Sequence, residues 1–236
     1  MKMTTVIALI PFFFLFALSQ AYQWPDGKYC LPMPLNRQCP PGWSEGYRRH
    51  DTEDFEGNKY CDVKRHGWVP YNYDLCNNPR WGFCCKTQEN YPRTGKQWPS
   101  GSYCIFRYGG TCPRNFASGY IYWDDEDSQN ENRRSGVLPD GVYGSNTKIY
   151  FCCRNVQGYS SSNQLSGLPQ FSEMILMRYK GTCPKAQSGH LGPHTGYLQW
   201  DTENTGNEDK RAGVFPDGGK TFESGIKIEF CSYTQL

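Results

Sequence analysis

Three short acidic clusters hold the residues most able to do chemistry in this chain. Each opens with an aspartate and gathers oxygen-bearing side chains: Asp51-Thr52-Glu53-Asp54, Asp124-Asp125-Glu126-Asp127 and Asp201-Thr202-Glu203-Asn204. Clustered carboxylates and amides suit a hard cation such as Ca²⁺, which takes about 6–8 oxygen ligands. The candidate ligand-binding or calcium-binding residues are therefore Asp51, Glu53, Asp54, Asp124, Glu126, Asp127, Asn132, Asp201, Glu203 and Asn204. No other cofactor is expected.

The same clusters also fit a purely structural role. Asp and Asn side chains accept hydrogen bonds from the backbone of their own turns, and they often follow strands. The spacing is not that of an EF-hand loop, and the glycine that bends such a loop is missing. The sequence favours the structural role, with cation binding and direct ligand contact as the two alternatives.

Recognisable catalytic motifs are absent from the sequence. The two carboxyls of a glycoside hydrolase flank one scissile bond, roughly 5–9.5 Å apart, whereas this acidic motif occurs three times. There is no Gly-x-Ser-x-Gly motif of hydrolases and no His-Glu-x-x-His motif of zinc proteases. We therefore expect a binding protein and no enzyme.

The acidic clusters belong to a longer unit that occurs three times, at about 23–87, 98–155 and 167–234. Each unit has a Cys-Pro step, then a Gly-Tyr run that leads into the acidic cluster, then a closing Phe-Cys. The second and third units also share a Pro-Asp-Gly turn at Pro139 and Pro216. Matches in the same order indicate three divergent copies of one sequence unit.

These units are predicted to be built from β-strands. Gly and Pro interrupt the chain every few residues, and no segment after residue 21 keeps a helical apolar period. Runs rich in Tyr, Ile, Phe and Trp predict strands at 103–108, 119–123, 148–152, 174–179 and 226–230. The predicted fold is all-β and pseudo-threefold, with a β-prism-like body preferred over a β-trefoil because the units are long for a trefoil leaf. Large aromatic side chains should fill its centre: Trp24, Trp98, Trp123 and Trp200.

The first 21 residues predict a secretory signal peptide. A basic start precedes an apolar run from Val6 to Leu18, and Ser19-Gln20-Ala21 supplies small residues for cleavage. The run is short for a membrane span of roughly 20 residues, and no second such run follows. We expect a secreted, extracellular chain without a membrane span, whose residues 22–236 form a single domain.

All 12 cysteines follow the leader, and an even number in a secreted chain predicts disulfides. Positions common to all units predict Cys39–Cys84, Cys112–Cys152 and Cys183–Cys231. Two further positions are replaced together in the third unit, by Ile175 and Ser232, which predicts Cys30–Cys85 and Cys104–Cys153. Cys61 and Cys76 share an insertion in the first unit and should bond each other. An exchange within Cys84/Cys85 or Cys152/Cys153 would also fit the sequence.

Charge gives no support for a nucleic-acid partner. Without the leader, 24 basic and 23 acidic residues remain, and they are interspersed along the chain. Nucleic-acid binding depends on a concentrated basic surface. We therefore expect no nucleic-acid partner.

The run from Trp98 to Arg154 resembles the domain at the C-terminal end of apextrins, the ApeC domain. The resemblance extends over about Gln23–Tyr233 and is weakest in the first unit, with its insertion and its Arg49-His50 pair. It is carried by four stretches: Trp98-Pro99-Ser100-Gly101, Tyr122-Trp123-Asp124-Asp125-Glu126-Asp127, Ser135-Gly136-Val137-Leu138-Pro139-Asp140-Gly141 and Phe151-Cys152-Cys153-Arg154.

The resemblance implies a secreted innate-immune or developmental protein of invertebrates. Such proteins are associated with recognition of bacterial cell-wall peptidoglycan or its muramyl dipeptide, and with agglutination of bacteria. The resemblance identifies no catalytic residue and no binding residue in this chain. The expected partner is a bacterial cell-wall glycan or glycopeptide. The alternative is an adhesive or extracellular-matrix protein without a microbial ligand.

Overall fold

The computed structural model of the protein describes residues 23–51, 70, 78–126, 129–155, 163–202, 206–220 and 225–236. Over these residues the chain forms strands, turns and bends but no helix, which confirms the all-β prediction. The thirteen strands are β1 (Tyr29–Pro32), β2 (Ser44–Arg49), β3 (Arg80–Lys86), β4 (Tyr103–Arg107), β5 (Ala117–Trp123), β6 (Arg133–Gly136), β7 (Gly141–Tyr143), β8 (Thr147–Arg154), β9 (Glu173–Arg178), β10 (His190–Asp201), β11 (Lys210–Gly213), β12 (Gly218–Lys220) and β13 (Gly225–Gln235).

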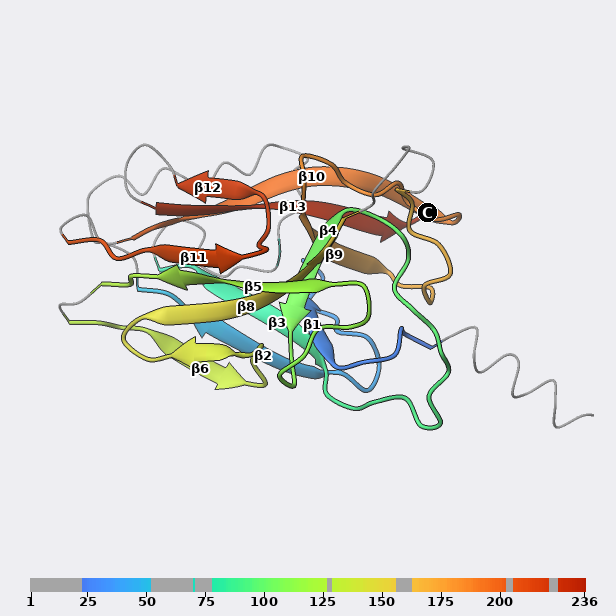
Figure 1. Cartoon of the computed structure of the whole chain (residues 1–236), viewed down its shortest axis with the longest axis horizontal. Helices are drawn as coiled ribbons and strands as arrows, with labels where there is room; N and C mark the ends of the chain where they lie inside the picture. The colour runs from blue at the N-terminus through green and yellow to red at the C-terminus, as the bar shows by residue number, and fades with distance from the viewer. Residues whose placement is uncertain are drawn as a thin grey trace, which may run out of the picture.

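All strands join one sheet that curls around the core as an open half-barrel (Figure 1). The same antiparallel pairing order occurs three times along the chain. The closing strand of each sequence unit lies between two earlier strands of that unit, as β1-β3-β2, β4-β8-β5 and β9-β13-β10. The five strands predicted from aromatic runs correspond to β4, β5, β8, β9 and β13.

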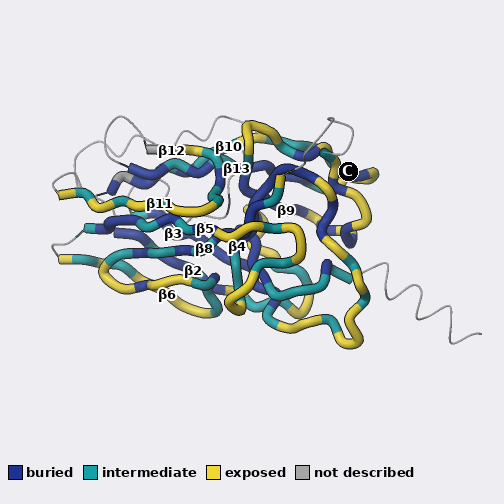
Figure 2. The backbone as a smooth tube through the Cα atoms, in the orientation of Figure 1, coloured by how far each residue is buried: buried dark blue, intermediate teal, exposed yellow. Residues whose placement is uncertain are grey.

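The first strands of the three units meet in the middle of the sheet. β4 pairs with both β1 and β9, and β1 also contacts β9. These three strands are buried along nearly their whole length (Figure 2). Alternate residues of β4 belong to two different apolar clusters, Cys104 and Phe106 to one, Tyr103 and Ile105 to the other. Core therefore covers both faces of the central strands.

Neighbouring units are also joined at their outer strands, where β6 pairs with β2 and β11 pairs with β5. Glycines allow the close approach of backbone to backbone at both junctions. A Cβ atom on Gly46 would lie 1.9 Å from the carbonyl oxygen of Val137, and one on Gly119 would lie 2.0 Å from that of Val214. Real carbon and oxygen atoms do not approach so closely, so neither position accepts a side chain without movement of a strand.

An aromatic triangle occupies the centre of the larger apolar cluster. His50, Trp123 and Trp200 stand at the same position of the three units, just before each acidic cluster. Their ring centroids are 5.4 Å (His50–Trp123), 5.6 Å (His50–Trp200) and 5.6 Å (Trp123–Trp200) apart. Trp98, Trp123 and Trp200 are buried as predicted, whereas Trp24 is only half-buried.

The part of the chain that the structure describes contains five disulfides, and their pairing matches the sequence prediction. They are Cys30–Cys85, Cys39–Cys84, Cys104–Cys153, Cys112–Cys152 and Cys183–Cys231. The sixth predicted pair, Cys61–Cys76, lies outside the described residues. In the described part of the chain, we find no helical segment with the length and hydrophobicity needed to cross a bilayer.

Candidate functional site

The structure places four of the ten predicted site residues in detail: Asp51, Asp124, Glu126 and Asn132. For Asp201, the last residue of β10, only the backbone is described. The remaining predicted site residues lie outside the described residues: Glu53, Asp54, Asp127, Glu203 and Asn204.

Asp51 and Asp124 make the same pair of contacts at two successive junctions between units. The backbone N–H of Asp51 donates to Asn132 Oδ1 (2.7 Å), and its carboxylate accepts the N–H of Glu131 (2.6 Å). The N–H of Asp124 donates to Asp209 Oδ1 (2.9 Å), and its carboxylate accepts the N–H of Glu208 (2.6 Å). Both aspartates thus tie the end of one strand to a loop of the next unit, and these hydrogen bonds are not to the backbone of their own turns.

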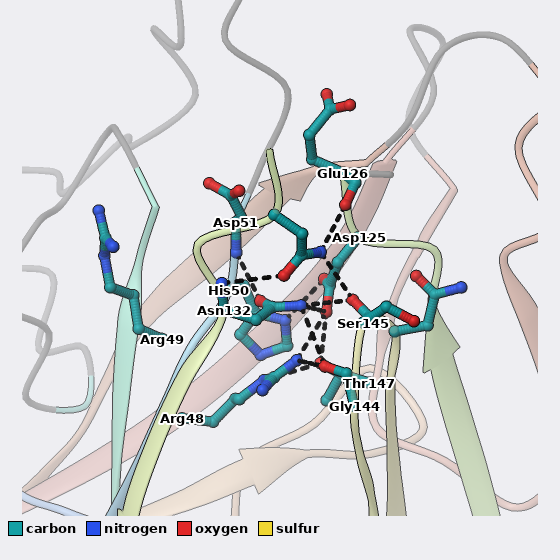
Figure 3. Close-up of polar contacts among 12 residues, drawn as sticks. Arg48, Arg49, His50, Asp51, Asp125, Glu126, Asn132, Gly144, Ser145 and Thr147 are labelled. Atoms are coloured by element: carbon teal, nitrogen blue, oxygen red, sulfur yellow. Dashed lines mark hydrogen bonds and ion pairs between the residues drawn. The ribbon is translucent and has the colours of Figure 1, made fainter. Parts of the chain in front are cut away.

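Asp125, the second residue of its cluster, is the centre of a buried polar network (Figure 3). Its carboxylate is 1% exposed and accepts four hydrogen bonds. The donors are His50 Nδ1 (3.0 Å), Arg48 Nη2 (3.2 Å), Asn132 Nδ2 (3.0 Å) and the hydroxyl of Thr147. The counter-charge and these donors replace the hydrogen bonds that the carboxylate would make to water.

Arg48 lies on the inner face of β2 and is itself buried. Its Nε donates to Thr147 Oγ1 (2.9 Å), and Nη2 donates to the carbonyl oxygen of Gly144 (2.9 Å) as well as to Asp125. Burial lowers the pKa of Arg48, and the charge of Asp125 opposes that shift. The ion pair therefore stabilises the charged form of an arginine that water does not reach.

His50 joins the polar network to the rings of Trp123 and Trp200. Since an ionised carboxylate only accepts, Nδ1 of His50 carries the proton that it shares with Asp125. Its Nε2 is buried and has no hydrogen-bond partner among the described residues. Burial lowers the pKa of His50 below its ordinary value, although Asp125 opposes the shift. The imidazole is thus held neutral between the rings of Trp123 and Trp200.

The polar network occurs at one junction only among those that the structure describes. Where the first unit has Arg48, the other two have Ile121 and Leu198. Thr202 and Ile226 stand in the third unit where the second has Asp125 and Thr147. The network is closed to solvent, so its chemistry is that of an internal ion pair and not of a surface that meets a ligand.

Sequence reasoning missed Asp125, Arg48 and His50 as a set. The available signal was a pair of polar residues, Arg48 and His50, at positions where the other units carry apolar or aromatic side chains. Nothing in the sequence told which acidic residue would face them. In the described part of the chain, no group of three or more His, Cys, Asp or Glu side chains is arranged to hold a metal ion.

Stability should fall as the solution becomes more acidic than about pH 6.5, because of His50. Its pKa in the folded state lies below the value of 6.5 expected for the unfolded chain, so the unfolded state takes up the proton first. The stabilisation is therefore complete above that pH and is lost as the pH falls. Urea unfolding between about pH 7.5 and 5.5 measures this slope. His50→Phe should flatten it, and an unchanged slope in that variant would contradict the assignment.

A solvent-filled groove of about 670 Å³ lies apart from the buried network. It is bordered by three chain segments, 26–28, 89–98 and 108–114. Two aromatic residues, Trp98 and Tyr108, form part of its wall. Its charged residues are the cationic Lys28, Arg93, Lys96 and Arg114 and the acidic Asp26 and Glu89. We call this site the basic groove. Its volume is within the range of ligand sites in proteins, about 300–1,000 Å³.

The wall of the basic groove is held in shape by Asp26. Its carboxylate accepts hydrogen bonds from the side chain of Asn90 (2.6 Å), from the hydroxyl of Thr94 (3.0 Å) and from the N–H of Gly95 (2.7 Å). Burial opposes ionisation of Asp26, but these hydrogen bonds outweigh it and lower its pKa. Partial burial lowers the pKa of Lys96 on the same wall. Glu89 accepts the N–H of Gly27 (3.1 Å) and lies 4.0 Å from Arg93. Arg114 is exposed, and Lys28 and Lys96 are half-exposed.

Comparison with known proteins gives one match. A family model for the C-terminal domain of apextrin, ApeC, matches residues 24–233. No curated protein and no solved structure is similar enough to count as a match.

Proposed function

Because the chain belongs to the ApeC family of apextrin C-terminal domains, we propose that it is a secreted innate-immune protein that binds bacterial cell-wall peptidoglycan. Recognition of the muramyl-peptide unit and agglutination of bacteria are part of this proposal. Five disulfides are consistent with an extracellular location, since such bonds persist in oxidising compartments. The signal peptide predicted over residues 1–21 supports the same location.

The basic groove is the observation that carries the proposal. Peptidoglycan joins sugar rings to short peptides that end in carboxylates. Sugar rings stack on aromatic side chains, and carboxylates pair with lysine and arginine. The groove offers the half-exposed ring of Tyr108 and the cations Lys28 and Lys96, whereas Trp98 in its wall is buried. Its wall is already ordered by Asp26, so little ordering cost accompanies binding.

Retention on insoluble peptidoglycan tests the proposal. The oxidised mature protein should be retained on peptidoglycan and not on chitin or cellulose. Lys96→Ala should weaken binding about tenfold, because it removes one charge-assisted contact. Lys185→Ala, an exposed lysine outside the groove, is the matched control and should bind as the unaltered protein does. Equal retention on all three polymers would instead favour the adhesive or matrix role.

Two further experiments test whether binding needs calcium and whether the protein hydrolyses peptidoglycan. Loss of binding in EDTA would assign a calcium ion to the acidic clusters, whereas unchanged binding is expected if those clusters are structural. We also propose binding without catalysis, so a peptidoglycan suspension should keep its turbidity during incubation. Clearing of the suspension would show that the protein is a hydrolase.

We further propose that the three units surround one axis in a β-prism-like arrangement. The meeting of β1, β4 and β9 supports this arrangement. So does the nearly equilateral triangle of His50, Trp123 and Trp200 at equivalent positions.

A further inference from the structure

The outward face of the second unit carries tyrosines and a lysine in cross-strand register. Along β5 and β8 the side chains alternate, with Ile121 and Ile149 buried and their neighbours half-exposed. Tyr120 lies opposite Tyr150, and Tyr122 lies opposite Lys148. We call these four residues the tyrosine–lysine face.

Cations and rings interleave on the tyrosine–lysine face. The ammonium of Lys148 is 3.8 Å from the ring centroid of Tyr120 and 4.9 Å from that of Tyr150. Arg107 stacks on Tyr150, with its Cζ 3.8 Å from the centroid. The two rings are 5.8 Å apart. Such contacts hold the lysine stem flat against the rings and fix the position of its charge.

The face continues onto both neighbouring strands. In β11, Lys210 lies opposite Tyr122, and in β7, Val142 lies opposite Lys148 and is 61% exposed. Arg107 pairs with Asp140 (2.9 Å) and Lys210 with Glu208 (2.9 Å). Lys148, at the middle, has no carboxylate within 4.0 Å among the described residues. Its charge is therefore available to a ligand.

The third unit has the same layout, but its cations are paired with carboxylates. Lys227 lies over Tyr197 (4.3 Å) as Lys148 lies over Tyr120. At the position of Tyr150, however, the third unit has Glu229. Glu229 pairs with Lys227 (3.0 Å) and with Arg178, so both cations there are already neutralised. Of the second and third units, the second therefore has the cation that adjoins two rings and has no carboxylate partner among the described residues.

We propose that the tyrosine–lysine face binds an acidic polysaccharide. Apolar C–H groups of sugar rings would contact the half-exposed Tyr120, Tyr122 and Tyr150 where Lys148 and Arg107 leave them open, and a carboxylate of the polymer would pair with Lys148. One central cation among neutral rings matches a chain that carries a charge once per sugar. It matches the dense phosphates of a nucleic acid poorly, since these require several cations in a row. The face shares no residue with the basic groove, so it is a second site beyond the proposed function.

Binding to immobilised polygalacturonate tests this site, with neutral dextran as the reference polymer and the whole oxidised protein as the analyte. The unaltered protein should bind polygalacturonate, more weakly at high salt, and should not bind dextran. Tyr150→Glu should weaken binding at least tenfold, because it gives Lys148 the partner that Lys227 has. Folding should be preserved, since β13 accepts glutamate at the same position, and circular dichroism with a melting curve checks this.

Two controls make the result specific. Lys227→Ala removes the already neutralised lysine of the third unit and should leave binding unchanged, whereas Lys148→Ala should reduce it about tenfold. Lys96→Ala in the basic groove should also leave it unchanged, which separates this site from the peptidoglycan proposal. Full binding by a folded Tyr150→Glu protein would overturn the proposal. So would equal binding of dextran, or equal or tighter binding of duplex DNA.

Discussion

Replacing Asp125 with alanine is expected to lower the free energy of unfolding by about 3–5 kcal/mol. The substitution leaves the buried guanidinium of Arg48 without its counter-charge. It also removes the acceptor of His50 Nδ1 and of Asn132 Nδ2. Urea unfolding at about pH 7.5, followed by tryptophan fluorescence, measures the loss, because Trp123 and Trp200 adjoin the network.

A second substitution distinguishes loss of an ion pair from loss of packing. Arg48→Ile introduces the kind of side chain found at this position in the other units, as Ile121 and Leu198. Combined with Asp125→Thr, the residue type of Thr202, it removes both charges together. The double variant should be more stable than Asp125→Ala, because no buried charge is left unpaired. An Asp125→Ala protein within about 1 kcal/mol of the original would contradict the network as described.

Gly119→Ala is expected to destabilise the protein by about 3 kcal/mol or more, through overpacking. The new methyl carbon would lie 2.0 Å from the carbonyl oxygen and 2.3 Å from the nitrogen of Val214. Both atoms belong to backbone, so no side chain can rotate away and the β5–β11 junction must open. The expected readout is a melting temperature lower by roughly 6–12 °C, since each kcal/mol shifts it by about 2–4 °C in a chain of this size.

The matched control is Gly144→Ala. No atom lies within 4 Å of a Cβ built at Gly144, and its backbone does not require a positive φ. Its carbonyl oxygen, which accepts from Arg48, is unchanged by the substitution. Stability should stay within about 0.5 kcal/mol of the original. If both variants melted alike, the close approach at Gly119 would not be the cause.

Strands with clean aromatic alternation were predictable from the sequence, and others were not. In β5 and β8, buried Ile and Phe alternate with half-exposed Tyr and Lys, which is the period-two pattern of a strand with one face in the core. β2 contains Ser44-Glu45-Gly46-Tyr47-Arg48-Arg49 and lacks that pattern, because a buried arginine replaces the apolar residue. β10 was not among the predicted strands, and Gly192-Pro193 near its start lies where a bulge interrupts the pairing.

The contacts of the acidic clusters could not be predicted from the sequence, nor could the basic groove. The repeats placed Asp51 and Asp124 at equivalent positions, and each lies just past the end of a strand, β2 or β5. Their partners, Asn132 and Asp209, come from the following unit, and pairing between units is a property of the tertiary fold. The same reason hid the tyrosine–lysine face, since only the register of β5 against β8 brings Tyr120 beside Tyr150.

The Arg48–Asp125 ion pair between the first two units affects how the chain assembles. Three units of similar sequence could dock against one another in more than one order, as related modules do in misassembled and domain-swapped proteins. Arg48 on the first unit and Asp125 on the second make one order chemically distinct. In any other order a bare guanidinium or carboxylate would be buried against Ile121, Leu198 or Ile226. The other docking orders are therefore higher in energy. The ion pair thus favours contact between the first and second units in addition to stabilising that contact.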